Sequence, residues 1–323
     1  MKDGFIKVAA GTPDVQVADC EFNAAEIIKM VREMEAEGAR VMVFPELCIT
    51  AYTCGDLFWQ ENLLEEAKVQ LMRIAEETAD VDAIIFVGLP LEYKGKLYNV
   101  AAGLNYGEIL GFVPKTYLPN YNEFYEARYF TSGEDVDGTV TIRRSEYGLH
   151  HDEEMTDEDV EFGLEAELEA LEEEDSFEEL EEIDEEPDYI DEDETEEFDE
   201  VDVPISSNIL FICQEMPKLK IAAEICEDLW VPNPPSVGHA YHGANLIVNL
   251  SASDEVVGKD SYRKSLVSAQ SARLLCGYIY ATAGEGESTQ DVVYGGHNLI
   301  AENGTILAAV SYTHLTLPTT PYV

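Results

Sequence analysis

The chain has 323 residues, 46% of them hydrophobic, which is enough for one large domain or two small ones with a sizeable core. Its formal net charge of −48 comes largely from residues 151–203, which hold 31 of the 67 acidic side chains and no Lys or Arg; the remainder keeps an ordinary acidic balance that excludes a nucleic-acid-binding protein. Because the chain opens without a basic and apolar leader and contains no long apolar run, we expect a cytoplasmic protein that does not insert into a membrane.

Strands and helices are predicted throughout the first 113 residues. Apolar residues recur at helical spacing in two segments, and short apolar runs bounded by turn residues indicate strands. The predicted strands are 5–10, 40–44, 83–89, 97–104 and 108–113, and the predicted helices are 23–37 and 63–78. Several of these strands are apolar throughout, which favours sheets that are covered on both faces.

The same mixture of elements resumes after residue 203. Strands are predicted at 208–213, 219–225, 245–250 and 278–283, and a helix at 260–275. The Asn303-Gly304 pair is a strong turn signal and predicts a hairpin over residues 299–309. Many strands combined with a few long helices predict a layered α/β domain.

An acidic stretch, residues 146–203, interrupts this pattern. Its charge density predicts a disordered surface insertion, with a segment that binds basic partners or cations as the alternative. His150 and His151 precede a run of acids, but adjacent His side chains point in different directions, so no metal site is predicted. The folded domain is then expected to comprise residues 1–145 and 204–309.

Residues 310–323 resemble the translation of an adapter used in sequencing libraries. We therefore expect a tail that is not native and a natural chain that continues beyond it. The alternative is a genuine last strand with a short tail.

Three predicted strands each end near a reactive side chain. Glu46 follows Val-Met-Val-Phe-Pro, Lys115 follows Gly-Phe-Val-Pro, and Cys226 ends Ile-Ala-Ala-Glu-Ile-Cys. Cleavage of an amide needs a base, a cation that stabilises an oxyanion, and a nucleophile, and these three residue types can supply them. From the residues alone, the alternative stays open that the Glu and Lys are solvated rim residues and the Cys a small core residue.

The remaining cysteines show no paired spacing. They are Cys20, Cys48, Cys54, Cys213 and Cys276. In a chain of this length such scatter predicts free thiols and no zinc framework.

The sequence around each reactive residue resembles a catalytic block of the nitrilase superfamily. The blocks are Phe44-Pro-Glu46-Leu-Cys-Ile-Thr-Ala-Tyr52, Pro114-Lys115-Thr-Tyr-Leu-Pro-Asn-Tyr121 and Glu224-Ile-Cys226-Glu-Asp-Leu-Trp230. Within the superfamily the chain is similar to the glutaminase domain of glutamine-dependent NAD+ synthetases. The further matching blocks are Tyr52-Thr-Cys-Gly-Asp-Leu-Phe58, Asn122-Glu-Phe-Tyr-Glu126, Asn249-Leu-Ser-Ala-Ser253 and Gly286-Glu-Ser-Thr289.

The resemblance implies an α-β-β-α four-layer sandwich that hydrolyses L-glutamine. Glu46 would be the general base, Lys115 the oxyanion and orienting residue, and Cys226 the nucleophile that glutamine acylates as ammonia leaves. The resemblance further implies that Glu123 positions the lysine. The residues implied to line the glutamine site are Tyr121, Ser253 and Lys259.

The resemblance also implies partners. The glutaminase domain itself needs no cofactor and no metal, whereas ATP and Mg belong to a C-terminal synthetase domain that has no counterpart in this sequence. Ammonia would reach that domain through a tunnel and be used to make NAD+ from deamido-NAD+, and a homo-oligomer is expected. Two alternatives remain: a free-standing amidase or carbamoylase of the same superfamily, and an acidic binding protein on an inactive sandwich scaffold.

Overall fold

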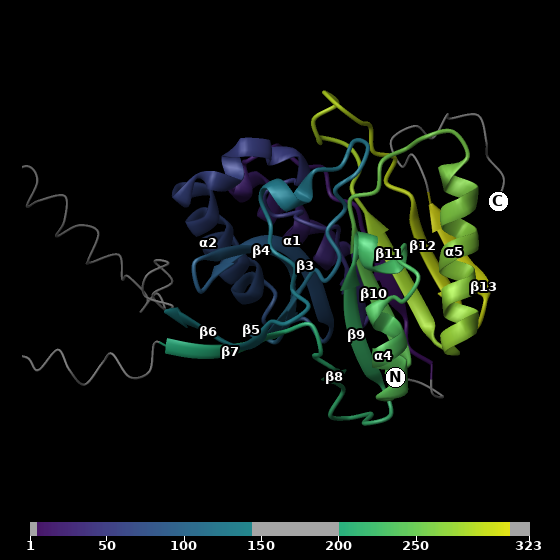
Figure 1. The fold of residues 1–323 in the computed structure, drawn as a ribbon. Coiled ribbons are helices and arrows are strands. Elements are labelled where there is room, and N and C mark those ends of the chain that lie inside the picture. Colours follow the sequence, from purple (N-terminus) through teal and green to yellow (C-terminus); the bar gives the residue numbers. More distant parts are fainter. Residues whose placement is uncertain (1–4, 144–199, 311–323) are drawn as a thin grey trace, which may run out of the picture. The chain divides into compact units, whose positions relative to one another are not determined.

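The structure, a computed structural model, describes residues 5–143 and 200–310 (Figure 1). The chain divides into two compact units, residues 1–141 with 202–323 and residues 142–201. Of the second unit only residues 142–143 and 200–201 are described, so the fold given below is that of the first. Most of the predicted insertion and of the predicted tail lies outside the described residues.

The first sheet combines parallel and antiparallel pairing. Its strands are β1 (Val8–Ala10), β2 (Val41–Val43), β3 (Ile84–Tyr93), β4 (Lys96–Asn105), β5 (Glu108–Pro114), β6 (Asp137–Arg143) and β7 (Glu200–Ser206). They lie in the order β1-β2-β3-β4-β5-β7-β6. Pairing is parallel from β1 to β3, antiparallel from β3 to β5 and parallel between β5 and β7.

The second sheet follows the same principle. Its strands are β8 (Phe211–Ile212), β9 (Lys220–Ile225), β10 (Leu246–Ser251), β11 (Gly277–Thr282), β12 (Asn298–Glu302) and β13 (Thr305–Val310). They lie in the order β13-β12-β11-β10-β9-β8, with a parallel centre from β9 to β11 and antiparallel strands at both edges.

Helices cover the outer face of each sheet (Figure 1). On the first sheet, α1 (Cys20–Ala36) packs beside α2 (Glu61–Glu77), and α2 contacts β3 and β5. On the second sheet, α4 (Pro235–Tyr241) contacts β9, and α5 (Lys259–Leu274) contacts β11, β12 and β13. These four layers confirm the predicted α-β-β-α sandwich. None of the helices in the described part is long and apolar enough to cross a membrane.

Helix α1 shows how local sequence sets an element. Asp19 precedes the helix, and its Oδ1 accepts a hydrogen bond from the Phe22 amide at 3.0 Å, which satisfies one of the free amides of the first turn. Ile27 and Val31 lie four residues apart on the buried face. Gly38 follows the helix with φ 82°, a conformation that costs glycine little.

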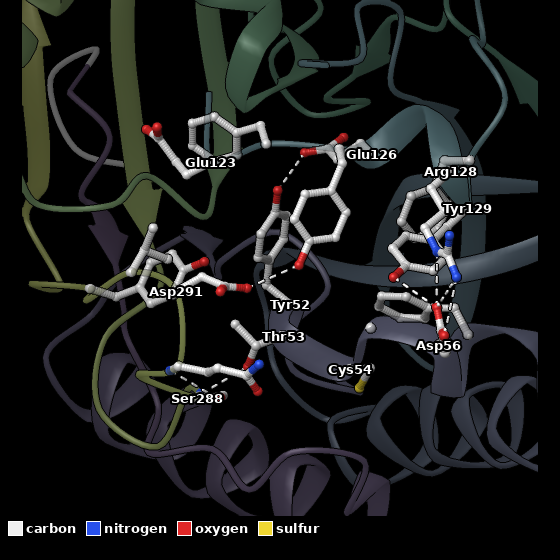
Figure 2. Close-up of a pocket in the computed structure, with 18 residues that line it drawn as sticks. Tyr52, Thr53, Cys54, Asp56, Glu123, Glu126, Arg128, Tyr129, Ser288 and Asp291 are labelled. Atoms are coloured by element: carbon white, nitrogen blue, oxygen red, sulfur yellow. Dashed lines mark hydrogen bonds and ion pairs between the residues drawn. The ribbon is translucent and has the colours of Figure 1, made fainter. Parts of the chain in front are cut away.

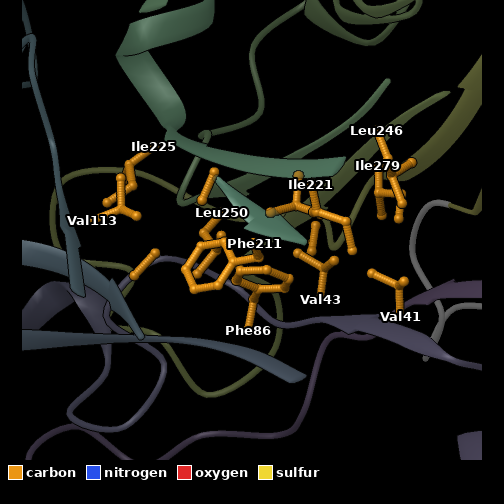
Figure 3. Close-up of a cluster of buried hydrophobic side chains, with 14 of the residues drawn as sticks. Val41, Val43, Phe86, Val113, Phe211, Ile221, Ile225, Leu246, Leu250 and Ile279 are labelled. Carbon is orange, nitrogen blue, oxygen red and sulfur yellow. The ribbon is translucent and has the colours of Figure 1, made fainter. Parts of the chain in front are cut away.

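The main core lies between the two sheets (Figure 3). Val43 and Phe86 from the first sheet and Ile221 and Leu250 from the second are buried in one cluster. The Phe86 ring meets Phe211 edge-on, with 5.1 Å between the ring centroids. Because both inner faces are apolar and closely packed, the sheets are held face to face, and the loops that leave one edge of each sheet are brought together.

Most predicted elements are confirmed, with ends shifted by a few residues. The hairpin of β12 and β13 turns at Asn303 and Gly304, whose φ values of 47° and 87° are both positive, as a two-residue hairpin of type I′ requires. All six cysteines are free, as their spacing predicts.

The boundaries predicted for the acidic insertion and the tail need correction. β7 begins at Glu200, so residues 200–203 form a strand instead of the end of the insertion. Val203 and Ile205 are buried while Asp202 and Pro204 are exposed, an alternation hidden by the acidic residues before it. Residue 310 closes β13 opposite Asn298 and does not begin the tail.

Three further elements differ from the sequence predictions. The strand predicted at 208–213 contains only Phe211 and Ile212. β6 and α4 are not predicted, because β6 lies in a polar segment and α4, with seven residues, is too short to show helical periodicity.

Candidate active site

The three reactive residues all lie at strand ends, as the sequence predicts. Lys115 directly follows β5, Cys226 directly follows β9, and Glu46 comes three residues after β2. β2 and β5 belong to the first sheet and β9 to the second. The fractional exposures of Glu46, Lys115 and Cys226 are 1%, 1% and 5%. They are therefore not solvated rim residues.

A buried ion pair joins two of these residues. Lys115 Nζ lies 2.5 Å from Glu46 Oε1, and neither side chain is exposed. The Asn99 amide donates to the same Glu46 oxygen at 2.6 Å, and the Ala252 backbone N–H donates to Glu46 Oε2 at 2.9 Å. Because both carboxylate oxygens accept hydrogen bonds, the carboxylate of Glu46 is held in one orientation.

A second buried carboxylate, Glu126, completes the surroundings of the lysine. Lys115 Nζ donates to Glu126 Oε1 at 2.8 Å. Burial raises the pKa of Glu126 to about 7, which the Lys115 ammonium opposes and the Glu46 carboxylate reinforces. Burial lowers the pKa of Lys115, but Glu126 and Glu46 outweigh it and hold this pKa well above its ordinary value. The lysine therefore stays charged between two carboxylates.

Glu123 is predicted to position the lysine, but among the described residues it does not contact Lys115, so this prediction is wrong. Lys115 pairs with Glu46 and Glu126, and Glu123 instead lines a pocket with a half-buried side chain. The segment after Lys115 turns through a short loop before the 3₁₀ turn Glu126–Arg128. Counting residues from the lysine does not show which glutamate this turn directs inward.

Cys226 lies in a constrained part of the backbone. Its φ of 43° is in the left-handed region, which is uncommon for a residue other than glycine, and a 3₁₀ turn, Cys226–Leu229, starts there. Burial raises the pKa of its thiol, as does the charge of Glu46, while Lys115 acts in the opposite direction. The resting thiol is therefore protonated at neutral pH, and attack on a substrate requires a base that removes its proton.

The residues implied to line a glutamine site have different surroundings. The Tyr121 hydroxyl donates to both carboxylate oxygens of Glu227, at 3.0 and 2.9 Å, next to the cysteine. Ser253, which is buried, directly follows the residue whose amide holds Glu46. The Lys259 ammonium pairs with Asp254.

Lys259 also lies near the aromatic residues of this region. Its Nζ is 5.6 Å from the ring centroids of both Phe124 and Trp230. Phe124 in turn packs against Tyr121, with 6.1 Å between ring centroids. Tyr121 and Lys259 thus come from different segments, and both lie close to residues that follow Cys226, at Glu227 and Trp230.

A pocket of about 750 Å³ adjoins the buried cluster (Figure 2). Glu126 and Tyr52 form part of its wall, and the Tyr52 hydroxyl donates to Glu126 Oε1 at 2.8 Å. Glu123, Asp56 and Asp291 also line it, so the pocket is mainly acidic and aromatic. No three His, Cys, Asp or Glu residues of the described part are grouped as metal ligands, and the His150-His151 pair lies outside that part.

Several residues of this region escape prediction from the sequence. Asn99 is a polar residue within an apolar strand, and this interruption is the signal that could have identified it. Glu126 and Glu287 are acids in segments rich in polar residues, where nothing distinguishes a buried carboxylate from an exposed one.

Asp228 joins the lysine loop to the cysteine loop. Its Oδ1 accepts from the Tyr117 amide at 2.8 Å, and its Oδ2 accepts from the Ile225 amide at 2.9 Å. Burial raises the pKa of Asp228 to about 8, against the effect of these amide donors. One carboxyl group thus holds the backbone beside Lys115 and the backbone beside Cys226.

Asp228→Asn is expected to loosen this connection. The asparagine NH2 would face an amide donor, so at least one bond is lost, with an expected destabilisation of about 1–3 kcal/mol. Displaced loops should lower turnover by about 10- to 100-fold. Urea unfolding and steady-state assays measure the two effects. Unchanged turnover in the folded variant would show that Asp228 does not position the loops.

A family model described as carbon-nitrogen hydrolase matches residues 7–320. The glutamine-dependent NAD(+) synthetase of Mycobacterium tuberculosis (strain ATCC 25618 / H37Rv) is 34% identical over 305 residues, which are 94% of this chain and 37% of that protein. That of Homo sapiens is 26% identical over 90% of this chain and 34% of its own length. The chain thus spans little more than a third of the length of these relatives.

Solved structures show the same fold. A glutamine-dependent NAD(+) synthetase from Cytophaga hutchinsonii superimposes with a TM-score of 0.66 at 25% identity, over 92% of this chain and 39% of that one. An amidase from Nesterenkonia sp. superimposes with a TM-score of 0.63 at 15% identity, over 97% of this chain and 88% of that one. The second likeness concerns the fold alone.

Proposed function

The chain belongs to the carbon-nitrogen hydrolase family, and from this premise we propose that it is a glutamine amidohydrolase that releases ammonia through a thioester on Cys226. The observation that carries the proposal is the buried pair of Lys115 and Glu46 beside a buried thiol. Burying an ammonium and two carboxylates is costly, and an arrangement of this kind is typical of a reactive site rather than of a core.

Acylation uses the three reactive residues together. Glu46 takes the thiol proton as Cys226 Sγ attacks the carbon of the glutamine side-chain amide, and the new C–S bond leaves a negative charge on oxygen. Lys115, fixed and charged, stabilises this oxyanion. The C–N bond then breaks, and Glu46 returns its proton to the leaving nitrogen, which departs as ammonia.

Hydrolysis of the thioester follows the same path with water. Glu46 removes a proton from a water molecule whose oxygen attacks the thioester carbon, the C–S bond breaks, and the sulfur recovers its proton. Glutamate is released and the resting thiol restored.

The head group of glutamine carries one positive and one negative charge. Glu227, which directly follows Cys226, and Lys259, whose charge acts on Glu227, supply the opposite charges, and Tyr121 and Ser253 contribute hydroxyl groups. This set favours an amino-acid substrate over a simple aliphatic amide.

In this proposal the released ammonia is used by a domain outside the described residues. The relatives at 34% and 26% identity are glutamine-dependent NAD(+) synthetases and are much longer than this chain. We infer that ammonia passes through a tunnel to a synthetase domain that uses ATP and Mg, in a cytoplasmic homo-oligomer. The glutaminase chemistry itself uses neither metal nor cofactor.

The free-standing amidase or carbamoylase is the second candidate. The fold is compatible with it, because this chain covers 88% of the amidase from Nesterenkonia sp. at a TM-score of 0.63. The two readings differ in substrate, so hydrolysis rates with glutamine, acetamide and an N-carbamoyl amino acid separate them. An inactive binding scaffold predicts no hydrolysis of any of them.

The test of the proposed function is labelling by a glutamine analogue that carries a chloroketone or diazoketone in place of the amide. We expect one label per chain on Cys226, none on Cys226→Ala, and protection by glutamine. Peptide mass spectrometry locates the label, and it reports the thiol even where turnover awaits a signal from another domain.

Cys213 provides the matched control. It is the cysteine with intermediate exposure, whereas Cys226 is buried. Non-specific alkylation would favour Cys213, because it is the more exposed thiol. The proposal instead predicts that Cys213→Ala keeps the label on Cys226. Labelling at Cys213, or nowhere in a folded sample, contradicts the proposal.

A further inference from the structure

A buried carboxylate outside the catalytic set, Glu287, holds the segment that carries Tyr52. Its Oε1 accepts from the Tyr52 amide at 2.8 Å, and its Oε2 accepts from the Thr53 amide at 3.0 Å and from Thr53 Oγ1 at 2.5 Å. Glu287 is 7% exposed. A carboxylate with three donors in one short segment fixes the position of that segment.

The backbone there needs such support. Ala51, immediately before Tyr52, has φ 70°, in the left-handed region that residues other than glycine seldom adopt. The Ser288 amide donates to Thr53 Oγ1 at 2.8 Å and adds a further bond between the two segments. The segment around Glu287 also packs closely against the backbone of Val15, since a Cβ at Gly286 would lie 1.7 Å from the Val15 carbonyl oxygen.

Tyr52 connects this support to the buried lysine. Its hydroxyl donates to Glu126 Oε1 at 2.8 Å, the bond drawn between the two labelled residues in Figure 2. The same oxygen accepts from Lys115 Nζ at 2.8 Å. The two donors together leave Glu126 Oε2 as a buried oxygen without a protein partner.

We infer that Glu287 is a positioning residue for the proposed glutaminase reaction, because it places the Tyr52 hydroxyl on the Glu126 oxygen that holds Lys115. The inference rests on the proposed function. Glu287 contacts neither the thiol nor the ion pair in the described contacts, so it acts through the backbone of Tyr52 and Thr53.

The pKa of Glu126 would report the loss of the hydrogen bond from Tyr52, and it depends on the charged and titratable groups around Glu126. Lys115, Glu46, Tyr52 and Cys226 influence Glu126 or are influenced by it. Burial raises the pKa of Glu126 to about 7, and the bond from Tyr52 acts against this rise. Displacing Tyr52 should therefore move this pKa upward.

The direction in which the pKa of Glu126 moves distinguishes a displaced Tyr52 hydroxyl from the mere loss of the Glu287 charge. Tyr294, Glu46, Cys48 and Cys54 lie within the electrostatic reach of Glu287. Removing the negative charge of Glu287 would by itself lower the pKa of a neighbouring carboxyl group. An upward shift consequently requires that the Tyr52 hydroxyl has moved.

The experiment compares kcat/KM for glutamine as a function of pH in the parent, Glu287→Gln, Tyr52→Phe and the double variant. In this inference the acidic limb of the profile reports the ionisation of Glu126, whose carboxylate holds Lys115. We expect both single variants to lose about 10- to 100-fold in kcat/KM and to show this limb displaced upward by about one pH unit. The double variant should equal the more impaired single variant, because both changes break the same connection.

A matched control is Glu224→Gln. Glu224 is also buried and accepts from a backbone amide, Ser236 N at 2.9 Å, and from a tyrosine hydroxyl, that of Tyr278. It lies on β9, two residues before Cys226. This variant should lose stability without a displaced acidic limb. If Glu287→Gln does not fold, Thr53→Ala removes one of the three donors and should give a smaller displacement in the same direction.

Two results would overturn the inference. One is a lowered rate in Glu287→Gln with the acidic limb in its parental position, and the other is multiplicative losses in the double variant. Failure of the proposed function has a different signature, since the parent would then neither hydrolyse glutamine nor be labelled at Cys226 by the analogue.

Discussion

Replacing Lys115 with methionine is expected to lower glutamine hydrolysis by about 100- to 1000-fold and to destabilise the fold by about 3–5 kcal/mol. Methionine has nearly the same length but no charge. Without the ammonium the oxyanion loses the cation proposed to stabilise it, and Glu46 and Glu126, which both contact Lys115 Nζ, are left as buried carboxylates that repel each other. Steady-state kinetics and urea unfolding measure the two losses.

The loss of stability should depend on pH. Burial raises the folded-state pKa of Glu126 from 4.5 to about 7, and Lys115 opposes this rise. Between these two pKa values the folded state binds more protons than the unfolded state. The contribution of Glu126 to the free energy of unfolding is therefore fully present below pH 4.5 and is lost as the pH rises through the folded-state pKa. In Lys115→Met that pKa rises further, and the decrease should extend to higher pH.

Unfolding of the variant at pH 5 and pH 8 therefore provides a direct check, with the larger deficit expected at pH 8. Lys68→Met serves as the control, since Lys68 forms a surface ion pair with Glu65 at 2.7 Å. Its removal should change the free energy of unfolding by less than about 1 kcal/mol at either pH. Equal deficits for Lys115→Met at both pH values would contradict the electrostatic explanation.

Gly88→Ala is expected to displace the loop that carries Glu46. Gly88 lies within β3, and a Cβ there would be 2.4 Å from Leu47 N, 2.7 Å from Pro45 O and 2.9 Å from the Glu46 carbonyl carbon. All three are backbone atoms, so no side-chain rotation relieves the overlap. We expect a loss of about 1–3 kcal/mol in stability and, for a shift of about 1 Å at Glu46, about 100-fold in kcat.

Gly238→Ala is the matched control for this prediction. Gly238 lies within α4, and a Cβ there would meet no atom within 4 Å. Because alanine favours a helix over glycine by about 1 kcal/mol, this variant should be as stable as the parent or more stable. If Gly88→Ala keeps both its stability and its turnover, the loop around Glu46 is more tolerant of displacement than proposed.

The sequence determines the layered α/β architecture and the elements that form it, because the signals are local. Periodicity predicts α1, α2 and α5, and the Asn303-Gly304 pair predicts the last hairpin together with its turn conformation. β7, like β6 and α4, is not predicted: its alternation is real, but it directly follows an acidic stretch whose composition dominates any sequence window.

The strand-end positions of Glu46, Lys115 and Cys226 also follow from the sequence, and the surrounding blocks suggest their roles. The sequence does not decide which residues complete the cluster. It favours Glu123, whereas the folded chain brings Glu126 to the lysine. The contact depends on a loop and a 3₁₀ turn whose path is set by packing rather than by spacing along the chain.

The tertiary structure alone decided the support of the site. Asp228 joins loops that are more than a hundred residues apart in sequence, and Glu287 holds the backbone of Tyr52 across 235 residues. Whether a carboxylate is solvated or buried depends on what the rest of the chain places around it. Local patterns therefore predict the strands and the reactive residues at their ends, whereas long-range packing determines which polar groups fix those residues in place.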